Sequence, residues 1–408
     1  MLFRVIIKIL ISEVNQMQLD IFKEPLQYEA NASEKKLDAF KQFHMKYASD
    51  WIRLDYLSEA FISDVKNTAE RIRKDFDALV VIGIGGSFIG AKAFIDALGS
   101  DFPIYFTGNM LDSGCITKLL HELRDKRYAI NVISKSGTTM ETKLVFEIFL
   151  DDMKKKGIDL VNGVIVTSSE ASELAKFARV HNIKTFTIPE DIGGRYSVFT
   201  AVGILPMAIA GLDIDALVLG IKSAKEEYFD NGSEDNTALD YAYYRHLSGD
   251  TYALEFISVY EERLATFTEW IKQLLCESLA KDGKGLIVSK LIYTQDLHSM
   301  GQLLQEGRRN IIETHIFAEQ LISQDEAINN LNKINEIAFK ATVKAHHMGG
   351  VPSCVIKLNE INEESLAKLA IFYMAACVYN AAMDMLEPYG QPGVEVYKEK
   401  IRNILEEG

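Results

Sequence analysis

Two short stretches of the chain combine the residue types that proteins use to hold a phosphate. The first, VVIGIGGSFIG at 80–90, passes from an apolar run into glycines and Ser87. The second, NVISKSGTTMET at 131–142, is rich in hydroxyl groups. Free backbone amides at a helix start attract anions, and nearby hydroxyls can join them. Each stretch is therefore a candidate anion site, although glycines at 83–90 would also suit a tight turn that serves packing alone.

The hydroxyl-rich stretch makes the stronger case. It brings four hydroxyls, one ammonium and a glycine together in six residues: Ser134, Lys135, Ser136, Gly137, Thr138 and Thr139. Thr138 and Glu141 have the spacing of a capping box, which predicts a helix that begins here. Amides, hydroxyls and the positive end of the helix dipole would then face one place, which suits a monophosphate. The alternative is an ordinary capped loop, since serine and threonine favour such positions. The GxxxxGK[ST] order of a Walker loop is absent.

A nicotinamide cofactor is not expected. Phe88 stands where a dinucleotide fingerprint needs its third glycine, and the next strand ends in Thr107, Gly108 and Asn109 instead of an acid that could hold a ribose. No group of His, Cys and acidic residues has the spacing of metal ligands, so we expect neither a cofactor nor a metal.

Apolar runs that alternate with helical stretches must position these two loops. Strands are predicted at about 78–84, 103–107, 128–134, 161–167 and 183–188, and later at 252–260, 311–316 and 352–358. A helical region at 213–249 separates the two groups. Strands that alternate with helices form parallel sheets covered on both faces, so we predict two α/β domains in contact.

Charge and composition limit the partners. The 408 residues carry a net charge of −14, which argues against a nucleic-acid or membrane-surface binder. The four cysteines are widely spaced, so a disulfide framework is not expected and a reducing cytoplasm is the simplest location. No stretch reaches the roughly 18 to 20 apolar residues that span a bilayer. The apolar N-terminus at 1–14 is interrupted by Lys8 and is interpreted as a first structured segment, or as an extension before a start near Met17.

Six ordered motifs together resemble the glucose-6-phosphate isomerase family in its shorter, bacterial form. They are VIGIGGSFIG (81–90), ISKSGTT (133–139), DIGGRYSVFTAVGILPMAIAG (191–211), CESLAKDGKG (276–285), TQDLHSMGQLLQEGRRN (294–310) and QPGVEVYK (391–398). The resemblance implies two flavodoxin-like sugar-isomerase domains with parallel sheets flanked by helices. It also implies reversible conversion of glucose 6-phosphate and fructose 6-phosphate, in glycolysis and gluconeogenesis, without a cofactor. We place the domains at 76–212 and 213–385, after an N-terminal helical segment (1–75) and before a C-terminal helix (386–408).

The resemblance also implies roles for individual residues. Those expected to bind the substrate and its phosphate are Gly86, Ser87, Ser134, Lys135, Ser136, Thr139 and Gln391. Glu277 matches the family's base, which would move a proton between C2 and C1 through a cis-enediol. Arg195 would stabilise the enediolate with a charge that it cannot lose. His298 would open the sugar ring, a task suited to an imidazole near neutral pH, with Lys398 as a partner in ring opening or binding.

The resemblance further implies a homodimer whose active sites are shared, with the histidine supplied by the neighbouring chain. The sequence departs from the family at Cys276 and Ala280, where glycine is usual around the base. Two alternatives stay open. A non-catalytic phosphosugar sensor would need the hydroxyl-rich loop but not Glu277, Arg195 and His298, so the enzyme is favoured. The second alternative is an isomerase that prefers another phosphosugar, such as mannose 6-phosphate.

Overall fold

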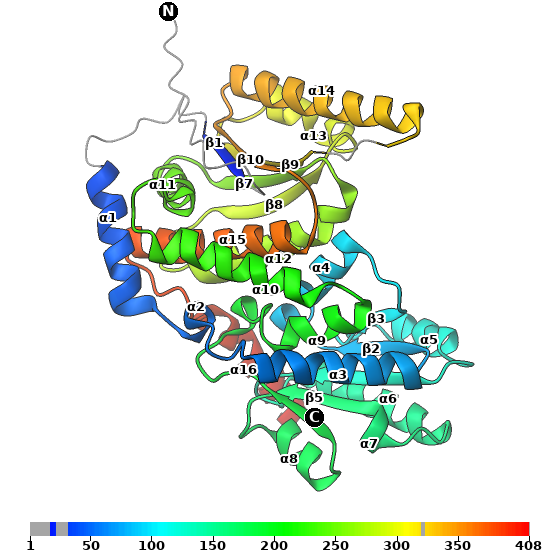
Figure 1. Cartoon of the computed structure of the whole chain (residues 1–408). Coiled ribbons are helices and arrows are strands. Elements are labelled where there is room, and N and C mark those ends of the chain that lie inside the picture. The colour runs from blue at the N-terminus through cyan, green and yellow to red at the C-terminus, as the bar shows by residue number, and fades with distance from the viewer. Residues whose placement is uncertain (1–16, 22–31, 320–322, 408) are drawn as a thin grey trace, which may run out of the picture.

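The structure is a computed structural model that describes residues 17–21, 32–319 and 323–407. The apolar N-terminus, up to residue 16, lies outside the described residues. Figure 1 shows the elements stacked in layers, with a sheet near each end of the stack and helices between and outside them.

The first sheet carries both candidate phosphate loops. Its five strands are parallel, in the order β3-β2-β4-β5-β6. The strands are β2 (Ala78–Ile82), β3 (Ile104–Thr107), β4 (Tyr128–Ile133), β5 (Val164–Ser168) and β6 (Lys184–Thr187). All five residues of β2 and all six of β4 are buried, as expected for strands covered on both faces. Numbered within the sheet, the order is 2-1-3-4-5, the flavodoxin-like arrangement.

The second sheet repeats this arrangement and adds an edge strand. Its parallel strands follow the order β8-β7-β9-β10, and β1 pairs antiparallel with β10. The strands are β7 (Leu254–Val259), β8 (Ile287–Ile292), β9 (Ile311–Ala318), β10 (Ser353–Leu358) and β1 (Gln18–Ile21). The sequence did not indicate β8 or β1. The second sheet, which was expected to be parallel, therefore contains one antiparallel strand. This strand, β1, comes from the N-terminal segment (1–75) that was predicted to be helical.

Helices of both halves meet between the sheets. From the first half come α3 (Glu59–Asp75), α4 (Ile89–Leu98) and α9 (Ala201–Ala210); from the second come α10 (Ile214–Lys225), α11 (Thr237–Gly249), α12 (Ala265–Leu279) and α15 (Glu363–Met383). Gly90 on α4 allows close packing, because a Cβ there would lie 2.9 Å from the side chain of Val198 and 3.6 Å from that of Trp270 on α12. The two halves therefore pack directly against each other beside the first phosphate loop.

The remaining helices lie outside this layer. They are α1 (Ala32–Gln42), α2 (Asp50–Arg53), α5 (Ser113–Glu122), α6 (Met140–Lys155), α7 (Leu160–Gly163), α8 (Glu173–Val180), α13 (Leu297–Glu306), α14 (Glu326–Met348) and α16 (Pro392–Glu407). Helices α13 and α14 cover the second sheet on the face opposite α12 and α15 (Figure 1).

Helix α15 corrects one expectation from the sequence. Among the described residues it is long and apolar enough to cross a membrane by length and composition, although no such stretch is expected from the sequence. Its most apolar part is 89% buried inside the protein, which identifies it as a core helix. The four cysteines, Cys115, Cys276, Cys354 and Cys377, are free, as expected.

Candidate active site

Both phosphate-loop candidates lie at the point where the first sheet reverses its strand order. Strands β2 and β4 are neighbours in the sheet. After β2 the chain continues to β3 on one side of this pair, and after β4 it continues to β5 on the other side. In α/β sheets, ligands bind beyond the carboxyl ends of the strands at such a reversal. Residues 83–87 follow β2 and residues 134–139 follow β4, so both loops occupy this position.

The hydroxyl-rich loop is organised by its own side chains. Ser134 Oγ accepts a hydrogen bond of 3.1 Å from the amide of Gly137 and shares one of 3.0 Å with the hydroxyl of Thr139. Ser136 Oγ accepts from the amide of Thr138 at 3.2 Å. Gly137 has φ +72°, which favours glycine. The loop therefore gathers hydroxyls at the start of α6.

The predicted capping box is wrong. Helix α6 begins at Met140, Thr139 occupies the N-cap position, and its side chain makes no capping bond. The Thr138 hydroxyl instead donates to Ser136 Oγ at 3.0 Å, so it is used within the loop. The first amides of α6 consequently have no side-chain cap from these threonines.

Lys135 connects this loop to the next motif. Its ammonium donates to the carbonyls of Glu190 and Ile192, at 2.5 and 3.1 Å. These carbonyls lie directly before the segment that carries Arg195. In the structure Lys135 thus ties the two motifs together, and contact with a phosphate stays a prediction.

The glycine loop approaches the same segment. Gly86 is buried, and a Cβ on it would overlap the carbonyl group of Gly194. Only glycine permits this approach of two backbones. Ser87 ends the short 3₁₀ turn at Gly85–Ser87 and is partly exposed. The approach of Gly86 brings the glycine loop against the turn of Arg195.

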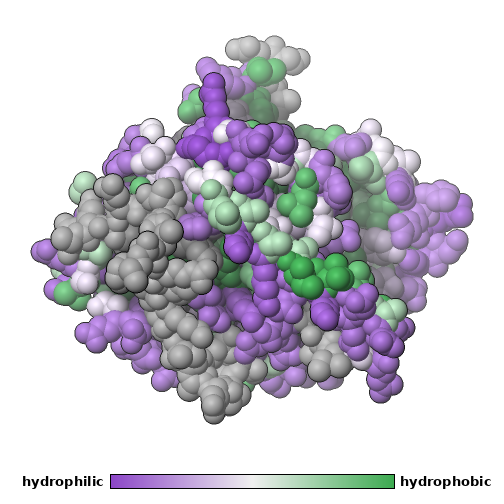
Figure 2. Space-filling view, turned by 90° about the horizontal axis from the view of Figure 1, so that it is seen from above, coloured by the Kyte–Doolittle hydropathy of each residue, from purple (hydrophilic) through white to green (hydrophobic). Residues whose placement is uncertain are grey.

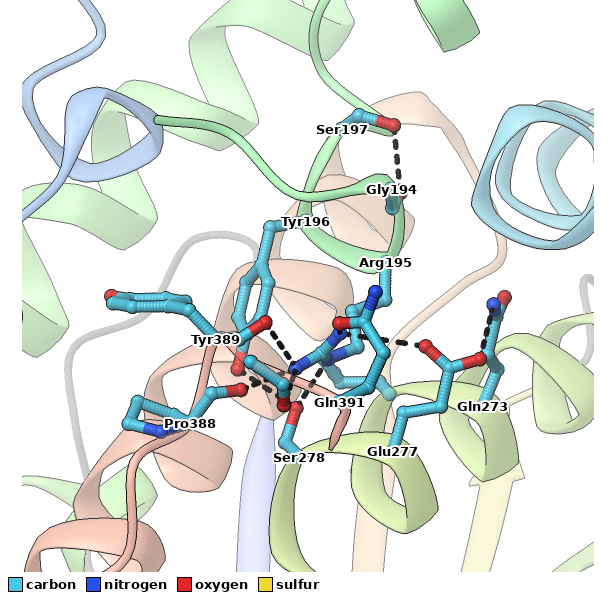
Figure 3. A network of polar contacts seen from close by, with 12 residues as sticks. Gly194, Arg195, Tyr196, Ser197, Gln273, Glu277, Ser278, Pro388, Tyr389 and Gln391 are labelled. Carbon is cyan, nitrogen blue, oxygen red and sulfur yellow. Dashed lines mark hydrogen bonds and ion pairs between the residues drawn. The ribbon is translucent and has the colours of Figure 1, made fainter. Parts of the chain in front are cut away.

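Arg195 is the centre of a polar network that joins three parts of the chain (Figure 3). Its side chain is only 2% exposed. Nε donates to Ser278 Oγ at 2.7 Å, and Nη1 donates to Gln391 Oε1 at 2.9 Å. Nη2 donates to the carbonyls of Pro388 and Tyr389, at 2.5 and 2.8 Å. With its donors used in fixed directions, the planar guanidinium is held rigidly.

The carboxylate of Glu277 completes this network. It lies on α12, its side chain is 33% exposed, and its Oε2 is 3.4 Å from Nη1 of Arg195. Gln273, one turn earlier, donates to Oε1 at 3.0 Å. One oxygen is thus oriented by an amide and the other by a cation, while the group still reaches solvent. Ala280, where the family usually has glycine, has φ −83° and ψ 77°, so its φ is negative and does not itself require glycine.

A second cation fixes the connection to the C-terminal helix. Lys281 donates to the carbonyl of Glu387, next to the carbonyls that Arg195 holds. Burial, together with the charge of Arg195, lowers the pKa of Lys281. The two cations clamp residues 387–390 and so place Gln391 beside Glu277.

Comparisons with known proteins find similar sequences over most of the chain. Residues 52–311 match the family model described as "Phosphoglucose isomerase". The chain is 40% identical to the glucose-6-phosphate isomerase of Caldanaerobacter subterraneus subsp. tengcongensis, with 87% of this chain and 86% of the relative covered. It is 39% identical to that of Staphylococcus aureus (strain Mu3), with the same coverage. The chain belongs to the phosphoglucose isomerase family.

Solved structures share the whole architecture. A hypothetical protein from Thermus thermophilus is 26% identical, with a TM-score of 0.82 over 92% of this chain and 94% of that one. A glucose-6-phosphate isomerase from Chlamydia trachomatis is 20% identical, with a TM-score of 0.79 over 96% of this chain and 88% of that one, and supports the fold. The predicted α/β fold of this phosphoglucose isomerase family member is confirmed.

Two residues assigned from the family motifs lie apart from the network. His298 is exposed near the start of α13, on the face of the second sheet opposite α12, and in the described parts of the chain its ring has no hydrogen-bond or ion-pair partner (Figure 1). Lys398 lies on α16, half exposed, and pairs with Glu395 at 2.9 Å. Within one chain of this family member, the structure thus unites Arg195, Glu277 and Gln391 but not His298 or Lys398.

Several supporting residues and one buried cluster were not predicted from the sequence. Gln273 and Ser278 could have been suspected, because they lie one turn before and one residue after the predicted base. The carbonyls that bind Arg195 carry no sequence signal. No sequence spacing revealed a metal cluster either, yet the structure brings together two histidines and a glutamate far apart in sequence, which are described below.

Proposed function

We propose that this chain interconverts glucose 6-phosphate and fructose 6-phosphate. The observation that carries the proposal is the pair of Glu277 and Arg195, a solvent-accessible carboxylate 3.4 Å from a buried, immobilised guanidinium. The pair adjoins two phosphate-loop candidates at the reversal of the first sheet. Family membership and the names of the relatives, both glucose-6-phosphate isomerases, indicate the substrate.

The phosphate binds at the two loops of the first sheet. Amides near Gly86 and the hydroxyl of Ser87 come from one side, and the hydroxyls of Ser134, Ser136 and Thr139 come from the other. A dianion is favoured there because α6 directs its amides and the positive end of its dipole to this place. Lys135 contributes positive charge nearby while it holds the carbonyls of Glu190 and Ile192.

Glu277 then acts as the base of the isomerisation. One carboxylate can remove the proton from C2 and return it to C1, provided that it reaches both carbons. Gln273 orients one of its oxygens, which leaves the carboxylate pointing into the site. Arg195 stabilises the charge that develops on the enediolate oxygen, and Gln391 binds a sugar hydroxyl.

Ring opening requires a further group, and among the residues that the structure describes His298 of the same chain is not brought to Glu277. His298 lies on the other face of the second sheet, so we propose that it enters the active site of a second copy. Lys398, exposed on α16, would assist in ring opening or binding. The active protein is then a homodimer with shared sites.

The surface beside His298 supports such an association. Helix α14 exposes apolar side chains at regular spacing: Ile328, Leu331, Ile334 and Ile337. Leu331 is 63% exposed, and Leu303 on the neighbouring α13 is 41% exposed. Figure 2 views the molecule from this side and shows hydrophobic patches among polar residues. Apolar patches of this kind mark interaction sites, so we propose that this face belongs to the dimer interface.

The domain boundaries, the location and the lack of a cofactor are part of the same proposal. We propose a cytoplasmic enzyme without a cofactor, built of an N-terminal segment (1–75), two sugar-isomerase domains (76–212 and 213–385) and a C-terminal helix (386–408). A phosphosugar sensor would not need the immobilised Arg195 beside Glu277.

The test is a direct assay by proton NMR with fructose 6-phosphate, chelator present and no nicotinamide added. Appearance of glucose 6-phosphate supports the proposal. Parallel reactions with mannose 6-phosphate separate the two isomerase alternatives, because a preference for mannose 6-phosphate would reassign the substrate. Binding of fructose 6-phosphate without conversion would indicate the sensor.

A further inference from the structure

Three side chains that can bind metals meet beneath α14, on the face of the second sheet opposite Glu277. Glu313 and His315 lie two residues apart on β9, so both face the same side of the sheet. His346 reaches them from the last turn of α14. Their ligand atoms all lie within 4.8 Å of one another. Glu313 and His315 are 0% exposed, and His346 is 3% exposed.

One carboxylate oxygen faces both imidazoles. Oε2 of Glu313 is 2.7 Å from Nδ1 of His346 and 3.3 Å from Nε2 of His315. The other oxygen is already satisfied, because it accepts hydrogen bonds from Ser258 at 2.6 Å and from Tyr293 at 2.5 Å. The carboxylate is thereby fixed with one oxygen turned towards the two rings.

The strongest indication of an ion is the environment of the His315 ring. Its Nδ1 forms a 3.2 Å hydrogen bond with the hydroxyl of Tyr260, which orients the ring. Its Nε2 is buried and lies 3.3 Å from Oε2 of Glu313, but among the described residues it makes no hydrogen bond of good geometry. An unsatisfied buried nitrogen is costly and calls for an explanation such as an ion.

We propose that Glu313, His315 and His346 form a structural binding site for a divalent transition metal such as Zn²⁺. Two imidazoles and a carboxylate are a ligand set that suits Zn²⁺, Co²⁺ or Fe²⁺, whereas Mg²⁺ and Ca²⁺ prefer oxygen ligands. The hydroxyls of Ser258 and Tyr293 bind Glu313, and that of Tyr260 binds His315. Hydrogen bonds of this kind fix the orientation of the ligands in metal sites.

The position in the fold indicates a structural role. The site lies between the second sheet and α14, whereas α12 with Glu277 covers the opposite face. An ion here would join β9 to the end of α14, two elements 33 residues apart at Glu313 and His346. It would therefore affect stability and leave the isomerisation step to other residues.

The test measures bound metal and melting temperature in the full-length protein, without an affinity tag. The protein is prepared from medium supplemented with zinc, and a metal-free sample is made by unfolding and refolding with chelator. We expect about one zinc ion per chain in the first sample. Adding Zn²⁺ to the second should raise the melting temperature, and adding Co²⁺ should give visible d–d absorption.

Variants locate the ion. His315→Gln and His346→Gln should lose the metal and the Zn²⁺-dependent rise in melting temperature. His347→Gln, the adjacent histidine on the same helix, should keep both. If the first two variants do not fold, X-ray absorption of the ion bound to wild type takes their place, and two imidazole ligands support the site.

The proposal is overturned by any of three results. The first is a wild-type protein that holds no ion and responds to neither Zn²⁺ nor Co²⁺, which would leave a buried carboxylate held by hydrogen bonds alone. The second is equal metal content in wild type and in both variants. The third is an ion without imidazole ligands.

Discussion

Nη1 of Arg195 lies 3.4 Å from Oε2 of Glu277, and the two residues are separated by 82 positions in the sequence. The arginine comes from a turn after the first sheet, and the glutamate comes from a helix of the second half. Contact between the halves therefore creates the proposed reaction centre. Because Ser278, Gln391 and the carbonyls of 388–390 also bind the guanidinium, its position is set before any substrate arrives.

Replacing Arg195 by lysine should lower kcat more than it raises KM. Lysine keeps the charge but loses the planar fork that binds Ser278, Gln391 and the carbonyls of 388–390 at once. By analogy with loss of one oxyanion donor, we expect kcat to fall about 100- to 1,000-fold. Steady-state kinetics with fructose 6-phosphate measure this. A variant with unchanged kcat and raised KM would show that Arg195 only binds the substrate.

Removing hydroxyls from the loop after β4 should have the opposite effect. Ser134→Ala and Thr139→Ala each delete one partner of the 3.0 Å bond between these residues and one expected phosphate ligand. Binding of the phosphate is common to ground and transition states, so KM should rise while kcat stays close to wild type. The same kinetic assay serves. A fall in kcat at unchanged KM would mean that this loop takes part in the chemical step.

Gly86 should tolerate no side chain, whereas Gly193 should. A Cβ on Gly86 would overlap the carbonyl of Gly194, and the backbone would have to move. We expect Gly86→Ala to destabilise the fold by about 1–3 kcal/mol and to reduce activity. Around Gly193 no atom lies within 4 Å of a Cβ, and its φ is −72°. Thermal unfolding of the two variants compares them; equal melting temperatures would refute the packing argument.

Mixing two inactive variants should restore activity if His298 acts on the partner's substrate. Co-expressed Glu277→Gln and His298→Asn chains form about half mixed dimers, so roughly a quarter of all sites would be intact. If both residues act within one chain, every site keeps one lesion. Differential tags isolate the mixed dimers, and their activity is compared with each variant alone. Absence of recovery in purified mixed dimers would refute a shared site.

The sequence predicted the first sheet well because its strands are short, apolar and separated by clear helices. All five strands lie within a few residues of their predicted positions, and both phosphate loops follow them as expected. In the second half, β8 was missed because Ser289 and Lys290 interrupt its apolar pattern. Polar residues are common in a strand at the edge of a sheet, where β8 lies. The pairing of β1 with β10 joins distant segments, which local pattern cannot reveal.

The site was predictable only as far as the motifs reach. They identified Arg195, Glu277 and Gln391, which the structure brings into one network. The carbonyls of 388–390 were invisible because backbone groups have no sequence signature. The group of Glu313, His315 and His346 was missed because its third member is 31 residues beyond the second, which is no ligand spacing recognised from sequence.

Incorporation of solvent hydrogen at C2 of the product, glucose 6-phosphate, tests the central claim, that Glu277 is the base of an isomerase. In deuterated water, wild type should incorporate deuterium at C2 as it converts fructose 6-phosphate. Glu277→Gln should lose both turnover and exchange by about 100- to 10,000-fold while still binding the substrate, because the amide keeps the size of the side chain and loses its basicity. Glu269→Gln is the control, since Glu269 lies two turns earlier on α12 and pairs with Lys290 at 3.0 Å. Exchange that is lost only in Glu277→Gln is the predicted result; exchange that continues in this variant would contradict the account.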